Sequence, residues 1–179
     1  MPSYVAFLRA VNVGGRFVTM AALRSALEDA GFEGVETHIQ SGNVLVRSRR
    51  RSTSAVAAEM EGVLREVAGF DVPCLVRTPA EVRGILEAAD GIPPMLTGTV
   101  RRYLALADGP VSAQAAATLD AWDREGERAK VLGSEVLAEL AVGFHKTTLT
   151  NARLERVTGR TTTWRDLEVI RAVDERWGT

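Results

Sequence analysis

Apolar positions in the first part of the chain change their spacing at short intervals, which predicts a series of short strands and helices. The continuous apolar run of residues 4–8 indicates a strand that is buried on both faces. Residues 20–30 carry apolar side chains at every third or fourth position, which is typical of a helix with one buried face. Thr19 can cap this helix and Gly31 can end it.

The apolar spacing predicts further elements up to residue 89. Alternation and a second apolar run over residues 35–46 predict a hairpin whose turn is Ser41-Gly42-Asn43. Cap residues and a helical stripe over 52–69 predict a second helix, and residues 72–77 a further strand. A capping box with proline at the first helical position begins another helix over 78–89. The order is therefore strand, helix, strand, strand, helix, strand, followed by one helix.

Residues 91–98 contain two prolines and two glycines and break every periodicity, so we expect a linker at 92–98 between a domain of residues 1–91 and one of residues 99–179. The second part repeats the order of the first. Its predicted elements are a strand at 100–106, a helix capped by Ser112, a hairpin around Gly133-Ser134, a helix over 149–157, a β-prone run at 161–163 and a last helix that opens with 163–166 and continues to Trp177.

Two halves with one element order predict an α+β fold made of two duplicated βαββαβ, or ferredoxin-like, subdomains packed together. Right-handed crossovers place both helices of each unit on one face of a four-stranded antiparallel sheet. Because residues 4–8 are apolar on both sides, we expect the second half to cover the other face, with a groove between the halves.

Composition agrees with a globular protein, since 46% of residues are apolar and 25% are charged. No apolar run approaches the length of a membrane span and the start of the chain does not resemble a signal peptide, so we expect a cytoplasmic protein without a membrane partner. The net charge of −1 provides no overall field for nucleic acid. Cys74 has no partner for an internal disulfide and is expected to be an inert core thiol.

The strongest candidate for a binding site is the loop Asn12-Val13-Gly14-Gly15, between a buried strand and a capped helix. Adjacent glycines let the backbone approach a ligand closely, and a helix start offers N–H groups to an anion. The loop lacks the third glycine of a dinucleotide fingerprint and the ending of a P-loop, so it matches neither motif. A tight crossover that needs glycine is the alternative interpretation.

The turn Gln40-Ser41-Gly42-Asn43 is the second part of the candidate site, although an ordinary turn uses the same residues. In a split βαβ unit the first strand lies beside the third, so this turn and the glycine loop should meet at one edge of the sheet. Arg9 would supply charge, and asparagine and glutamine side chains would supply amide donors and acceptors. The predicted ligand-binding residues are Arg9, Asn12, Gly14, Gly15, Gln40, Ser41, Gly42 and Asn43.

Three segments of this region, Phe7–Gly15, Met20–Leu27 and Gln40–Val44, resemble the opening of a bacterial family catalogued as domain of unknown function 1697. The resemblance implies an α+β fold of two similar subdomains and carries no established activity, substrate or cofactor. Looser similarity extends to residues 143–149 and 161–167, where Thr147-Thr148 replace the usual Ser-Lys and the Arg-Asn pair before the tryptophan that corresponds to Trp164 is missing.

Several other interpretations stay open. His38, His145, Lys146 and Thr147 are a possible second wall of the groove, and a histidine there could move a proton in an enzyme, although no catalytic residue is identified. Neither histidine has ligand-spaced partners, so no metal or cofactor is expected.

Arginines offer an alternative in which the protein binds nucleic acid. The residues concerned are Arg47, Arg49, Arg50, Arg51, Arg101 and Arg102. The strand at 44–46 has no aromatic side chain on which a base could stack, which makes nucleic acid the less favoured partner. A structural partner module is a further alternative, and the sequence does not indicate an oligomeric state.

Overall fold

The computed structural model describes residues 1–178, which form two compact units. The first comprises residues 1–83 together with the chain from residue 173 onward, and the second comprises residues 84–172. This grouping differs from the predicted linker at 92–98 because α3 (Pro79–Asp90) is one continuous helix that begins in the first unit and ends in the second. Helix α6 (Leu167–Trp177) likewise returns the chain to the first unit.

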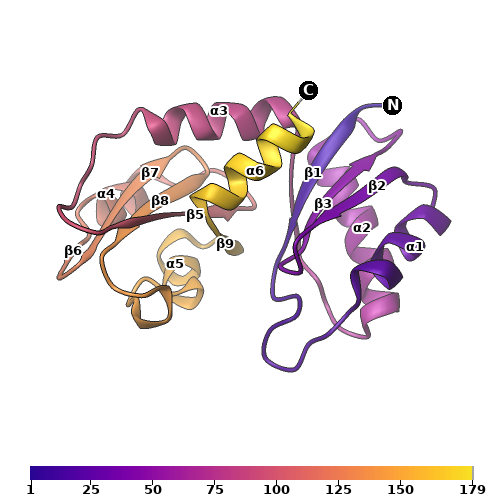
Figure 1. The fold of residues 1–179 in the computed structure, drawn as a ribbon, viewed down its shortest axis with the longest axis horizontal. Coiled ribbons are helices and arrows are strands. Elements are labelled where there is room, and N and C mark those ends of the chain that lie inside the picture. The colour runs from indigo at the N-terminus through magenta and orange to yellow at the C-terminus, as the bar shows by residue number, and fades with distance from the viewer. Residues whose placement is uncertain (179) are drawn as a thin grey trace. The chain divides into compact units, whose positions relative to one another are not determined.

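An antiparallel sheet and two helices make up the body of the first unit (Figure 1). The elements are β1 (Ser3–Leu8), α1 (Met20–Asp29), β2 (Glu33–His38), β3 (Asn43–Arg47), α2 (Thr53–Ala68) and β4 (Cys74–Arg77). The strands lie in the order β2-β3-β1-β4, which is the order of a split βαβ unit because each helical crossover skips one strand. The predicted meeting of β1 with β3 is therefore confirmed.

The core of this unit lies between the sheet and its helices. Tyr4, Ala6 and Leu8 of β1 pack in one cluster with Leu23 of α1 and Met60 of α2. Both leucines are fully buried, and burial of such a side chain stabilises the fold by about 2 kcal/mol. The alternate residues of β1 are buried as well, so the strand is covered on both faces, as predicted.

Trp177, at the end of α6, provides part of the cover on the opposite face of the first sheet. Its indole Nε1 donates a hydrogen bond to Glu36 Oε2 at 3.0 Å, and its ring lies 6.3 Å from the ring of His38. Glu36 and His38 are on β2, with their side chains directed away from the buried Val35. The last helical turn therefore groups with the first unit, whereas the predicted second domain, residues 99–179, includes it.

The second unit repeats this topology. Its elements are β5 (Arg101–Ala107), α4 (Ala113–Asp120), β6 (Asp123–Arg124), β7 (Glu127–Leu132), β8 (Glu135–Leu140), the 3-10 helix η1 (Phe144–Lys146), α5 (Asn151–Thr158) and β9 (Thr162–Asp166). The strand order is β6-β7-β8-β5-β9, the scheme of the first sheet with β6 added at one edge. Leu119 of α4 and Leu154 of α5 share a core cluster with Ala105 and Ala138 of the sheet, so both helices cover one face. The fold is α+β with two antiparallel sheets.

One predicted boundary is wrong. Residues 163–166 were expected to open the last helix, but they belong to β9, and α6 begins at Leu167. Thr163 pairs with Leu106 and Arg165 with Leu104 in the antiparallel ladder to β5. The ladder satisfies the backbone of this segment, which overrides a sequence pattern that resembles a helix cap.

Candidate functional site

The loop after β1 and the turn before β3 are joined by hydrogen bonds. Asn12 Nδ2 donates to the carbonyl oxygen of Gln40 at 3.0 Å. Leu8 N donates to the carbonyl oxygen of Gly42 at 2.8 Å. The expectation that these two segments meet is therefore confirmed, and the residues from Arg9 to Thr19 form one loop cluster with residues 38–43.

Both asparagines of the candidate site bind the protein's own backbone. Asn12 Oδ1 accepts from Val18 N at 3.0 Å, while its amide nitrogen is used by Gln40. Asn43 is completely buried, and its Nδ2 donates to His38 O at 3.0 Å and to Ser41 Oγ at 3.3 Å. These side chains hold the loop cluster in shape, which differs from their predicted role as direct ligand contacts.

The glycines of the cluster have two different functions in the backbone. Gly14 and Gly15 are exposed with φ of +58° and +82°, and the turn is closed by a hydrogen bond from Arg16 N to Val13 O at 3.1 Å. Within residues 1–178 no acceptor is found for the N–H groups of these two glycines. Gly42 is buried, and a Cβ there would lie 2.8 Å from Leu8 Cβ, so only glycine fits.

Backbone strain concentrates in the same cluster. Three residues other than glycine have positive φ in the described chain, namely Ala10 at 57°, Asn12 at 57° and Ile39 at 52°. The left-handed conformation costs an L-residue about 1–2 kcal/mol, and a β-branched residue such as isoleucine adopts it least readily. The rest of the fold therefore holds this region in a conformation that its sequence does not favour locally.

A cavity of about 330 Å³ borders the cluster where α1 begins. Its lining residues are Asn12, Phe17, Val18, Thr19, Met20 and Gln40. Thr19 caps α1 by accepting a hydrogen bond from Ala22 N at 3.1 Å, as predicted. The first turn of α1 contains no acidic residue, so no side chain of that turn neutralises the positive end of the helix dipole.

The loop of residues 9–19 in the cluster carries two arginines and no acidic residue, although the whole chain has a net charge of −1. Neither residues 9–27 nor residues 37–58 contain an aspartate or glutamate. Arg9 is half-buried, and Arg16 is exposed with its guanidinium 5.5 Å from the ring centroid of Phe70. The local charge therefore favours an anion, while the net charge of −1 conceals it.

The four residues predicted as a second wall fall into different units. His38 is half-buried beside Trp177 and belongs to the first unit with the loop cluster. His145, Lys146 and Thr147 belong to the second unit, on and after η1. Thr147 Oγ1 accepts a hydrogen bond from Leu149 N at 3.1 Å, and the histidine and lysine are exposed.

Comparison with known proteins connects this architecture to a family. A family model described as Protein of unknown function (DUF1697) matches residues 1–137, which include the whole loop cluster. The chain belongs to the DUF1697 family. A search of curated proteins found no match.

A solved structure supports the fold of this DUF1697 protein along its whole length. It is the conserved bacterial protein SP0830 from Streptococcus pneumoniae, which matches with a TM-score of 0.74 and 20% sequence identity. The match covers 100% of this chain and 99% of that one. At this level of identity the likeness establishes the shared fold alone.

The arginine segment of this DUF1697 chain lies in a mixed electrostatic environment. Arg50 Nε is 3.0 Å from Glu59 Oε2, and the cavity of about 600 Å³ beside it is also lined by Glu28 and Glu33. Acidic side chains therefore share this surface with Arg49 and Arg50. In the second unit, Arg101 pairs with Asp166 at 3.1 Å.

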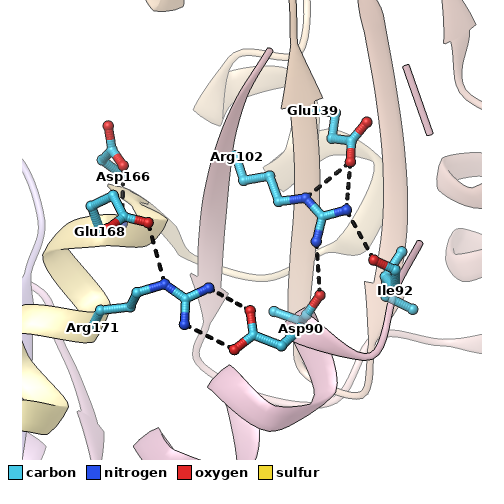
Figure 2. Close-up of polar contacts among 8 residues, drawn as sticks. Asp90, Ile92, Arg102, Glu139, Asp166, Glu168 and Arg171 are labelled. Carbon is cyan, nitrogen blue, oxygen red and sulfur yellow. Dashed lines mark hydrogen bonds and ion pairs between the residues drawn. The ribbon is translucent and has the colours of Figure 1, made fainter. Parts of the chain in front are cut away.

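A buried ion pair in the second unit was not found by sequence reasoning (Figure 2). Glu139 of β8 is 2% exposed, and its Oε1 accepts from Arg102 Nε at 2.9 Å and from Nη2 at 2.7 Å. Its Oε2 accepts from the backbone N–H groups of Met95 and Leu96, both at 2.7 Å. Arg102 also donates to the carbonyl oxygen of Ile92 at 2.9 Å. The pair therefore ties the segment after α3 to the sheet.

Arg171 of α6 forms a second charged group in the same unit. It donates to both carboxylate oxygens of Asp90 and, at 3.2 Å, to Glu168 (Figure 2). The hydrogen bond from Arg171 lowers the pKa of Asp90, outweighing the opposite effect of partial burial. These two groups line a cavity of about 650 Å³ whose lining charges are paired within the chain. One feature of the sequence could have indicated the buried ion pair. Glu139 is a charged residue inside the apolar run of residues 136–142.

Two further observations bear on chemistry. Cys74 is buried, so its expected place in the core is confirmed, and burial raises the pKa of its thiol well above the usual value, with nearby Glu61 adding to this effect. Within residues 1–178, no group of three or more histidine, cysteine, aspartate or glutamate side chains is placed to hold a metal ion. The same residues include no helix long and apolar enough to cross a membrane.

Proposed function

We propose that this DUF1697 protein binds a small anionic molecule at the loop cluster of its first unit. The observation that carries the proposal is the occurrence of three features within the short stretch of residues 14–20. They are the exposed amides of Gly14 and Gly15, the beginning of α1 without an acidic side chain, and Arg16 in a segment that contains no acidic residue.

Each part of the cluster has a distinct role in this proposal. The N–H groups of Gly14 and Gly15 donate to oxygen atoms of the anion, as consecutive backbone amides do in other anion sites. Arg16 contributes charge, and because it is exposed it can rotate toward the ligand. Asn12 is a positioning residue, since its amide fixes the distance between the loop and the turn.

Isothermal titration calorimetry with inorganic phosphate tests the proposal. Wild-type protein is expected to bind phosphate, and R16Q is expected to bind it about tenfold more weakly because one charge-assisted hydrogen bond is lost. R51Q is the matched control, since Arg51 is an exposed arginine of the same unit outside the cluster, and it should bind like wild type. Equal affinities for wild type, R16Q and R51Q, or no binding at all, would contradict the proposal.

A further inference from the structure

We infer that the ligand of this site is an anion that also carries a flat apolar ring, and that Phe17 contacts this ring. The inference rests on the proposed function, because it specifies the class of molecule that the loop cluster binds. It is carried by Phe17, an exposed apolar residue that lines the cavity at the start of α1, and by two further exposed apolar residues of the loop cluster.

Three exposed apolar residues belong to the loop cluster, and one of them, Phe17, lines this cavity. Phe17 is 72% exposed, Val13 57% and Ile39 48%, which makes them the most exposed large apolar residues of the described chain. Phe17 lines the cavity itself, whereas Val13 and Ile39 are direct neighbours of its lining residues Asn12 and Gln40. The hydrogen bond between Asn12 and Gln40 keeps the two neighbours on the same cluster. A local concentration of exposed apolar surface of this kind marks an interaction site.

The fold does not need Phe17 in this position. Residues that flank a helix cap often pack together, and here Val18 and Leu23 fulfil this role because both are buried in the core of the first unit. Phe17 precedes this pair and lies outside the core. Ile39 is both exposed and held at a φ of 52°, so neither burial nor relaxed backbone geometry explains its conformation.

Chain position and size restrict the ligand. Phe17 is two residues from Gly15 and two residues from Thr19, so the ring would lie close to the amides that receive the anionic group. The cavity of about 330 Å³ is at the small end of the range for ligand pockets, about 300–1,000 Å³. A compact aromatic phosphate or carboxylate therefore fits better than a long acyl chain or a peptide.

Calorimetry with phenyl phosphate and methyl phosphate tests the inference, because the two esters share the anionic group and differ in the ring. Wild type is expected to bind phenyl phosphate about tenfold more tightly than methyl phosphate. This preference should disappear in F17A, with methyl phosphate affinity unchanged. F144A is the matched control: Phe144 is an exposed phenylalanine of the second unit, so the preference should persist there.

Each alternative outcome has a definite meaning. Equal affinity of wild type for both esters overturns this inference while leaving the proposed anion site in place. A preference for phenyl phosphate that survives in F17A also overturns it, because another surface then contacts the ring. Failure of wild type to bind either ester overturns both proposals. If sedimentation shows a wild-type dimer that F17A dissociates, and no ester preference exists, the apolar cluster is a contact between two copies of the chain and the inference is wrong.

Discussion

Asn12 and Asn43 show how polar side chains in loops can act on the protein that contains them. Each provides hydrogen bonds to the backbone of a neighbouring segment, and Asn43 does so from a fully buried position. A buried carbonyl group that loses its donor is expensive, whereas an exposed one can bond to water. The asparagines therefore determine the shape of the candidate site, and the proposed function assigns ligand contact to Arg16 and the two exposed glycines.

Replacing Asn43 with alanine should destabilise the fold. The substitution removes the donor to His38 O, so we expect N43A to lower the free energy of unfolding by about 2 kcal/mol. Urea denaturation followed by circular dichroism measures this change. Q40A is the control, because Gln40 is exposed and contributes its backbone carbonyl, not its side chain, to the hydrogen bond with Asn12, and its effect should stay within about 0.5 kcal/mol. An N43A protein as stable as wild type would contradict the assigned role.

Glu139 supports a second prediction at the level of one residue. E139Q leaves the partly buried Arg102 without its charge partner and should lower the free energy of unfolding by about 3 kcal/mol, as expected when one member of a buried ion pair is neutralised. Hydrogen exchange at the amides of Met95 and Leu96 should also accelerate. E168Q, at a side chain that is 73% exposed, should change stability by no more than about 0.5 kcal/mol. Similar stabilities of E139Q and E168Q would refute this account.

Helix ends are the part of the fold that the sequence predicts best. Thr19 and Ser52 cap α1 and α2, and Thr78 exchanges hydrogen bonds with Glu81 at the start of α3, all as expected. These contacts join residues three positions apart, so the local sequence contains all the information they need. The prediction of a helix start at residues 163–166 was wrong because a contact distant in sequence, the pairing with β5, determines the conformation there.

The segment that follows η1, around Thr148, should loosen in acid because one carboxylate holds it. Glu127 of β7 accepts from Thr148 N at 2.6 Å and from Thr148 Oγ1 at 2.7 Å, with Trp122 Nε1 at 3.2 Å. Burial by itself raises the pKa of Glu127, but the hydrogen bonds from Thr148, Trp122 and Thr147 outweigh it and lower the pKa below the usual value.

A lowered pKa in the folded state fixes the direction of the pH effect. The contribution of Glu127 is fully present above the ordinary glutamate pKa, about 4.3, and is lost as the pH falls through the lower pKa of the folded state. Hydrogen exchange at Thr148 N, compared with exchange at amides remote from η1, should show this acid-induced opening. In E127Q the segment should be open at neutral pH as well. A pH profile of E127Q identical to that of wild type would contradict the prediction.

At the scale of the molecule, the sheet topology explains why the meeting of the glycine loop with the turn of residues 40–43 could be predicted. The order of strands brings β1 beside β3, and this neighbourhood places the glycine loop next to the turn of residues 40–43. Exposure could not be predicted in the same way. Phe17 and Ile39 have apolar side chains of the kind that usually lie in a core. Only the path of the folded chain leaves them exposed to solvent.

The local charge of the loop cluster could not be predicted from the net charge either. A net charge of −1 suggests no preference for anions, yet the acidic residues are absent from both segments of the loop cluster. The sum over the chain therefore conceals a local imbalance. The second unit has the same strand scheme but pairs its buried charges internally, as at Arg102 and Glu139. One topology thus supports a charged exposed cluster in one unit and a neutralised charged cluster in the other.

Titration of ¹⁵N-labelled protein with inorganic phosphate, followed by two-dimensional amide NMR, tests the anion site most directly. The amide signals of Gly14, Gly15 and Met20 should shift together and saturate with one binding constant. Signals of residues 49–51 and of the second unit should remain in place. Saturable shifts confined to the arginine segment or to the second unit, or no saturable shift in the loop cluster, would show that the anion site is not where we place it.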